Sequence, residues 1–126
     1  AVADLEARPL TFDEPMEMRN IEFPVDGSTL DAGSKRLLKS FASYLQRHPS
    51  FHARLEGHTD NTGDPETNIV LSANRAEAVK DFLIEQGVAA ERLEAKGFGA
   101  ARPIADNNTS SGKSANRRTE FAIFVP

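Results

Sequence analysis

The chain has no cysteine and no tryptophan, and a single tyrosine among its 126 residues. Without cysteine it can form neither a disulfide framework nor a thiolate metal site, although this leaves its compartment open. An excess of basic residues is also missing. The net charge at pH 7 is −4, whereas nucleic-acid binders normally present a basic surface. We therefore expect no nucleic-acid partner.

Long apolar runs are absent as well. No stretch approaches the ~18 apolar residues of a membrane span and the N-terminus carries no signal-peptide pattern, so we expect no membrane insertion by this segment. The chain starts at Ala1 rather than at methionine, which indicates a processed product or a piece of a longer protein. Its length and its 39% apolar content suffice for one hydrophobic core and one domain.

What the chain does contain is an alternation of strand and helix patterns. Residues 1–19 show no sustained period and are predicted to be a lead-in or linker, with the domain at 20–126. Helices are predicted where apolar residues recur at helical spacing, and strands where they alternate or form short runs. The predicted helices are 34–48 and 65–86, and the predicted strands are 20–23, 51–58, 92–99 and 117–125.

Local signals mark the ends of the second predicted helix. Asp64 followed by Pro65 is a favourable start, and Gly87 is a favourable end. Residues 101–116 are rich in turn formers and are predicted to be a long surface loop. The order of elements predicts an α/β (α+β) two-layer sandwich, βαβαββ, with a mixed sheet and the helices packed on it.

An arginine lies on the apolar face of this second helix. At about 100° per residue, Asn68, Ser72 and Arg75 project to the same side. Burying an unpaired guanidinium would cost several kcal/mol, so Arg75 needs a carboxylate, a bound anion or an open crevice. Asp60, just past the strand at 51–58, is the nearest acidic candidate. Open α/β sheets bind ligands beyond the carboxyl ends of their strands. We therefore predict a small cleft lined by Asp60, Asn68 and Arg75.

Two interpretations of this pair stay open at the level of the residues. Asp60 and Arg75 can form a structural ion pair that ties the loop to the helix. Alternatively, the two side chains can bind an amino-acid head group. Asp60 would then take the ammonium, and Arg75 would clamp the carboxylate with a bidentate fork.

Neither a metal site nor an enzyme site is predicted. His52 and His58 share a strand face but lie about 20 Å apart at ~3.3 Å per residue, too far to ligate one ion. Glu56, His58 and Asp60 would share that face, but no nucleophile accompanies them. We expect no metal, no cofactor and no catalysis.

An ordered set of short motifs runs through the second half of the chain. It consists of TDNTG at 59–63, LS at 71–72, RA at 75–76, GFG at 97–99 and NRRTEF at 116–121. Together with Asn68 and Pro103, this set resembles the C-terminal domain of outer-membrane protein A and the peptidoglycan-associated lipoprotein. The resemblance covers about residues 20–125 and is specific because of the length and order of the combination.

The resemblance implies non-covalent binding of peptidoglycan through the diaminopimelate residue of its stem peptide, which anchors an outer-membrane or envelope protein to the cell wall. It assigns the central contacts to Asp60 and Arg75, with further contacts from Asn68, Thr59 and Arg117. It also implies the periplasm of a Gram-negative envelope and attachment to the outer membrane through a part absent from this chain. Other envelope proteins are further partners. The alternative is a protein-interaction module of the same fold that has lost the ligand.

One position departs from the family pattern. Members often carry an acid directly after the phenylalanine of the first strand, where this chain has Pro24. Pro24 offers neither a side-chain acceptor nor a backbone donor. Asp26, in the same predicted loop, is expected to compensate and completes the predicted set of ligand contacts.

Overall fold

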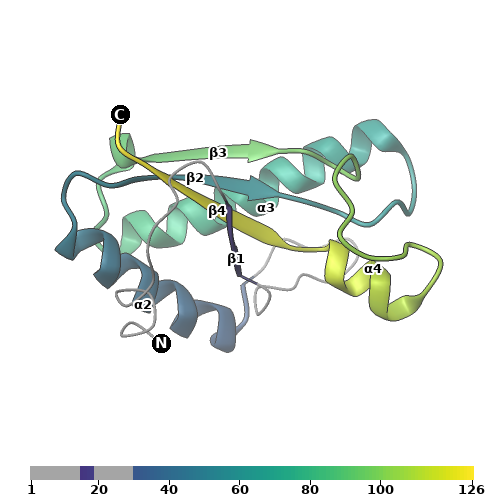
Figure 1. The fold of residues 1–126 in the computed structure, drawn as a ribbon, viewed down its shortest axis with the longest axis horizontal. Helices are drawn as coiled ribbons and strands as arrows, with labels where there is room; N and C mark the ends of the chain where they lie inside the picture. The colour runs from purple at the N-terminus through teal and green to yellow at the C-terminus, as the bar shows by residue number, and fades with distance from the viewer. Residues whose placement is uncertain (1–14, 19–29) are drawn as a thin grey trace.

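The computed structural model of the chain describes residues 15–18 and 30–126. Within them, four strands form one mixed sheet, with α2 and α3 on one of its faces and α4 at one end (Figure 1). The strands are β1 (Pro15–Met18), β2 (His52–Gly57), β3 (Leu93–Gly97) and β4 (Thr119–Phe124). The helices are α2 (Ala32–Arg47), α3 (Pro65–Glu85) and α4 (Ser110–Asn116), with a 3-10 turn, η1, at Ala90–Arg92.

The strand order in the sheet is β1-β4-β2-β3. β2 pairs in parallel with β3, to which α3 connects it, and antiparallel with β4. β1 pairs antiparallel with β4 at the other edge of the described sheet. The predicted two-layer α/β sandwich, with a mixed sheet and helices packed on it, is confirmed.

Within residues 1–19, which were predicted to be a lead-in or linker, Pro15–Met18 form the strand β1. Four residues are too few to show a periodic pattern. A proline is tolerated there because it is the first residue of the strand. The strand predicted at 20–23, together with Pro24 and Asp26, lies outside the described residues. The boundary of the domain stays a prediction.

The connection between β3 and β4 contains a helix, where a loop over 101–116 was predicted. α4 begins after Thr109, whose hydroxyl accepts a hydrogen bond from the Gly112 N–H at 2.9 Å. The described elements therefore run βαβαβαβ rather than βαβαββ. Serine, glycine and asparagine have low helix propensity, so this short helix depends on its cap and its tertiary contacts, which composition does not reveal.

The hydrophobic core lies between the two long helices and the sheet. Apolar side chains from α2 and α3 meet the inward residues of β2 and β4 in one cluster. The largest fully buried members are Leu38, Phe41, Tyr44, Leu45, Leu55, Val79, Leu83, Phe121 and Ile123.

α3 begins and ends where the sequence signals predicted. The Asp64 side chain accepts a hydrogen bond from the Thr67 N–H at 3.0 Å, and Pro65 occupies the first helical position. Gly87 follows the helix with a φ of 102°, in the left-handed region that favours glycine. These ends fix the register of α3, which determines which of its residues face the sheet.

Two paired glycines allow α3 to lie directly on the sheet. Gly57 of β2 and Gly97 of β3 are partners in the parallel ladder. A Cβ atom at Gly57 would lie 2.1 Å from the Ser72 carbonyl oxygen, and one at Gly97 would lie 2.4 Å from the Ala73 nitrogen. The Ser72 hydroxyl accepts a hydrogen bond from the Gly99 N–H at 2.8 Å and ties α3 to the end of β3. Only glycine permits this close approach.

We expect Gly57→Ala to lower the free energy of unfolding by about 3 kcal/mol, because helix backbone occupies the space of the new methyl group. Urea denaturation followed by circular dichroism measures this. Gly33→Ala is the matched control. Its Cβ would meet nothing closer than 3.5 Å, and alanine stabilises a helix by up to ~1 kcal/mol relative to glycine. A Gly57→Ala protein as stable as wild type would contradict the close contact.

Candidate functional site

β2 and β3 end, α3 begins and α4 lies at the same end of the sheet (Figure 1). A pocket opens there, between the loop after β2, α3 and the residue after α4. Its volume is about 130 Å³. The loop after β2, the first half of α3 and the residue after α4 supply its walls. The lining residues are Thr59, Asp60, Thr62, Gly63, Asp64, Thr67, Asn68, Leu71, Arg75 and Arg117. The predicted cleft therefore exists, and it brings together the predicted residues Asp60, Asn68, Arg75, Thr59 and Arg117.

Asp60 is buried and oriented by two hydrogen bonds. One carboxylate oxygen accepts from the Thr62 N–H at 2.8 Å, and the other accepts from Nη1 of Arg117 at 2.8 Å. Burial raises the pKa of Asp60, but the hydrogen bonds from Thr62 and Arg117 and the charge of Arg117 outweigh it. Together they hold the pKa below its ordinary value. Asp60 is therefore an anion at neutral pH.

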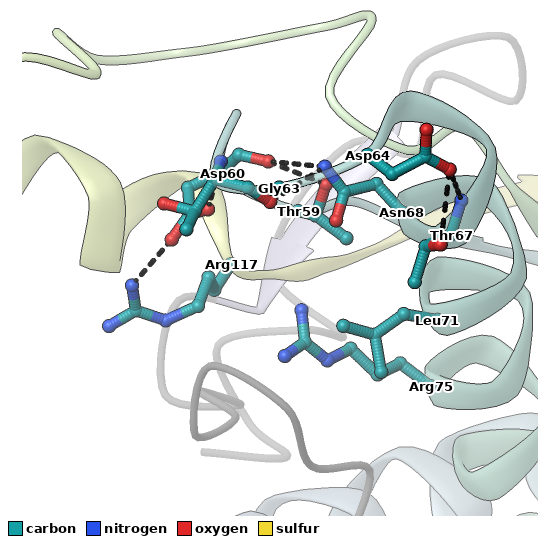
Figure 2. A pocket seen from close by; sticks show the side chains of 10 residues that line it. Thr59, Asp60, Gly63, Asp64, Thr67, Asn68, Leu71, Arg75 and Arg117 are labelled. Atoms are coloured by element: carbon teal, nitrogen blue, oxygen red, sulfur yellow. Dashed lines mark hydrogen bonds and ion pairs between the residues drawn. The ribbon is translucent and has the colours of Figure 1, made fainter.

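Arg75 is fully buried, with 0% of its surface exposed. It lies on the inward stripe of α3 with Asn68 and Ser72, which are buried too, as the helical spacing predicted. Figure 2 shows its guanidinium projecting from α3 toward the side of the pocket where Asp60 and Arg117 lie. A guanidinium offers five N–H donors in a planar fork, so this wall can receive an anion.

Asp60 forms an ion pair with Arg117, at 2.8 Å (Figure 2). The first of the two interpretations of the sequence had placed this ion pair between Asp60 and Arg75. Asp60 and Arg75 instead line the same pocket from different elements. Arg117 reaches Asp60 because it follows directly on α4, the helix that the sequence pattern did not predict.

Asn68 and Thr59 shape the loop around Asp60. The side-chain amide of Asn68 donates to the Thr62 carbonyl at 3.1 Å and to the Asp60 carbonyl at 3.5 Å. The Thr59 hydroxyl donates to the same Asp60 carbonyl at 2.7 Å. These contacts bind the loop to the first turn of α3, so the pocket wall has a fixed conformation.

Asn116, which was not among the predicted site residues, holds α4 in place. Its side chain is fully buried and makes four hydrogen bonds. The oxygen accepts from the N–H groups of Ile104 and Ala105 at 2.7 and 3.0 Å. The nitrogen donates to the Ala105 carbonyl at 3.0 Å and to Asn107 at 2.8 Å. Asn116 thereby positions the next residue, Arg117. Its place in the NRRTEF motif was the only sequence signal.

We expect Asn116→Ala to lower the free energy of unfolding by about 3 kcal/mol, because it removes three part-buried hydrogen bonds to the backbone of residues 104 and 105, each of which contributes about 1 kcal/mol. Urea denaturation measures the loss. Asn107→Ala removes one of the four partners and should cost about 1 kcal/mol. Equal stability of the two variants would contradict a central role for Asn116.

A second group of charged residues is buried on the sheet face that points away from the helices. Glu56, His58 and Glu120 are at most 8% exposed, and their ligand-type atoms lie within 4.8 Å of one another. The strand at 51–58 was predicted to have one polar face. That face exists, but Glu56 and His58 on it are buried. Arg54 donates to Glu56 at 2.8 Å, and Arg118 forms an ion pair with Glu120.

The charges around His58 argue against a metal ion in this group. Burial, and then the positive charges of Arg118 and Arg102, lower the pKa of His58 to about 3. The carboxylates of Glu56 and Glu120 are already paired with Arg54 and Arg118, so we assign no metal to these residues. His52 lies at the other end of β2, 5.6 Å from the Phe124 ring.

His58 predicts a decline of stability in mild acid. Histidine in an unfolded chain has a pKa of about 6.5, whereas folded His58 has a pKa of about 3. Between these values the unfolded state binds one proton more, so the free energy of unfolding falls as the pH falls. The slope is at most about 1.4 kcal/mol per pH unit.

Urea denaturation between about pH 7.5 and about pH 5.5, above the carboxylate range, should show this decline, and His58→Asn should flatten it. His52→Asn is the matched control on the same strand, and it should keep the decline because His58 is still present. A His58→Asn protein with the wild-type slope would show that the buried imidazole is not the cause.

By its architecture the chain is a two-layer α/β domain with a charged pocket beyond the carboxyl ends of its parallel strands, which is a ligand-binding arrangement. The family model described as the OmpA family matches residues 22–117. The chain therefore belongs to the OmpA family, and the resemblance noted from its motifs is confirmed.

Outer membrane porin F of Pseudomonas aeruginosa is 40% identical over 105 residues, which covers 82% of this chain and 30% of the relative. The peptidoglycan-binding protein ArfA of Mycobacterium tuberculosis is 39% identical over 103 residues, with 82% and 32% covered. The chain thus spans about a third of the length of these curated relatives. The structure is also similar to the crystal structure of the peptidoglycan-associated lipoprotein from Burkholderia pseudomallei. The TM-score between the two is 0.80 at 32% sequence identity, and the match covers 82% of this chain and 88% of that chain.

The names of these relatives are those of a porin, a peptidoglycan-binding protein and a peptidoglycan-associated lipoprotein, which agrees with the expectation that this chain is not an enzyme. In the part of the chain that the structure describes, no helix combines the length and the apolar character needed to cross a membrane.

Proposed function

We propose that this domain binds peptidoglycan non-covalently and that its pocket holds the side-chain end of diaminopimelate in the stem peptide. Membership of the OmpA family supports peptidoglycan as the ligand, as does the likeness to a peptidoglycan-binding protein and a peptidoglycan-associated lipoprotein. The observation that carries the diaminopimelate assignment is the pocket itself. It contains a buried anion, Asp60, and a buried cation, Arg75.

The chemistry of the ligand matches these two side chains. The side-chain end of diaminopimelate carries an ammonium and a carboxylate on one carbon. An ionised carboxylate has about four lone-pair sites, and Thr62 and Arg117 use two of those on Asp60. Asp60 can therefore accept the ammonium without releasing Arg117. Arg75 takes the ligand carboxylate with its planar fork.

The rest of the pocket orients this head group. Arg117 adds a second cation beside Asp60, while Asn68 and Thr59 hold the loop that carries Asp60. Asp26 stays a predicted contact from the loop after the first predicted strand. No covalent bond is made or broken in this mechanism.

Anchoring is the role that follows from such binding. We place the domain in the periplasm, attached to the outer membrane through a part of the protein outside this chain. The relatives named as outer-membrane porin and lipoprotein support this location. The attachment holds a larger envelope protein to the cell wall, and many weak contacts on a polymeric wall add up to firm retention.

Sedimentation with purified peptidoglycan sacculi tests the contact residues. We expect Asp60→Asn to bind at least about tenfold more weakly, because a hydrogen bond to a charged group contributes about 1.5–3 kcal/mol. Arg75→Lys keeps the charge but loses the fork, and it should weaken binding as well. The matched control is Asp106→Asn. Asp106 is exposed and accepts from the Asn108 N–H, as Asp60 does from Thr62, but it lies outside the pocket.

Circular dichroism confirms that each variant is folded before it is assayed. Folded Asp60→Asn and Arg75→Lys proteins that sediment like wild type would show the proposal to be wrong. Cell wall that contains lysine in place of diaminopimelate distinguishes a diaminopimelate-binding domain from a protein-interaction module of the same fold. A diaminopimelate site requires weaker binding to that wall, whereas an interaction module without the ligand retains neither wall.

A further inference from the structure

α4 presents two cations to the loop that forms the pocket. Lys113 and Arg117 lie four residues apart, one within the helix and one directly after it, so they project to the same side. Arg117 reaches Asp60, and the Lys113 ammonium donates to the Thr62 hydroxyl at 2.9 Å. Thr62 lines the pocket, so Lys113 stands at its rim.

We propose that Lys113 binds a second carboxylate of the same ligand, one on the main chain of the stem peptide. This inference rests on the proposed function, because it assumes that the side-chain end of diaminopimelate occupies the pocket. It adds a specificity-determining residue, and it defines the ligand as a peptide with two anionic centres rather than one.

The spacing of the two cations supports this assignment. One helical turn separates Lys113 from Arg117, which is about 6 Å along the axis. In diaminopimelate, four carbon–carbon bonds separate the side-chain head group from the main-chain carbon, about 5 Å in an extended chain. A ligand whose head group contacts Asp60 therefore places its main chain at the rim, within reach of the Lys113 side chain.

Lys113 can take a carboxylate without losing an existing ion pair. Within residues 30–126, its hydrogen bond is to the neutral hydroxyl of Thr62, and no carboxylate forms an ion pair with it. An ammonium has three donors, of which this contact uses one. Lys113 is only half-buried, so solvent screens the new pair and its effect on affinity should be modest, roughly three- to fivefold.

Isothermal titration calorimetry with two synthetic tripeptides tests this inference. Both contain L-alanine, γ-linked D-glutamate and diaminopimelate, and both keep the free side-chain head group. In the first peptide the main-chain carboxylates are free, and in the second they are amidated. Wild type should bind the free acid roughly three- to fivefold more tightly than the amide. Lys113→Gln should bind both peptides equally, because glutamine keeps a donor for Thr62 and lacks the charge.

Lys39→Gln is the control for the change in net charge. Lys39 is exposed on α2, and its replacement should keep the wild-type ratio between the two peptides. A Lys113→Gln protein that also keeps the wild-type ratio would overturn the inference while leaving the diaminopimelate pocket intact. Asp60→Asn identifies the other failure. If it binds both tripeptides like wild type, the proposed function itself is wrong, whatever Lys113 does.

Discussion

The close contact between α3 and the sheet is the constraint on which the site depends. Backbone meets backbone at Gly57 and Gly97, and the Ser72 hydroxyl fastens the helix to the end of β3. Asn68 lies one turn before Ser72, and Arg75 lies almost one turn after it. Close packing of the helix on the sheet therefore fixes both residues beside the pocket, at the carboxyl ends of β2 and β3. This placement lets a fully buried guanidinium form a pocket wall.

Two groups of charged residues, one in the pocket and one on the far face of the sheet, lie where β2 ends and β4 begins. Asp60 follows His58 by two residues, and Arg117 directly precedes Arg118. The two arginines serve different partners, Asp60 in the pocket and Glu120 on the far face of the sheet. The backbone N–H of His58 donates a hydrogen bond to the backbone carbonyl of Arg118 at 2.9 Å, and this bond joins the segment after β2 to the segment before β4. Buried charges are tolerated only when they are paired, so each group stabilises the backbone on which the other depends.

The parts that sequence predicted best are those with dense local signals. α3 carries a cap, a proline, a terminal glycine and a long periodic stripe, so its ends and the inward direction of Arg75 could be foreseen. The position of Asp60 near Arg75 followed from the direction of the strand, and the role proposed for Asp60 follows from the resemblance of the motifs to the family. β1 is too short to show a period, and α4 has weak helix formers that gain order only from tertiary contacts.

Long-range contacts explain the remaining differences. Arg117 pairs with Asp60 across 57 residues, and the four hydrogen bonds of Asn116 join residues 9 to 12 positions apart. Nothing local encodes such partners. Alternation assigned Glu56 and His58 to one face of β2, but it could not tell that this face is covered. The burial of a face depends on which other elements lie over it.

β2 is paired on both sides, with β4 and with β3, and Asp60 lies just beyond its last residue. If Asp60 holds the ligand as proposed, a force that pulls on the ligand in the direction of β2 would be transmitted along this strand. The ladders on either side would then bear the tension together, in shear, rather than opening one rung at a time. The few contacts between the domain and the ligand would then break before the hydrogen bonds of the sheet. If the domain anchors an envelope protein as proposed, an overloaded contact would therefore release its ligand while the domain stays folded and able to bind again.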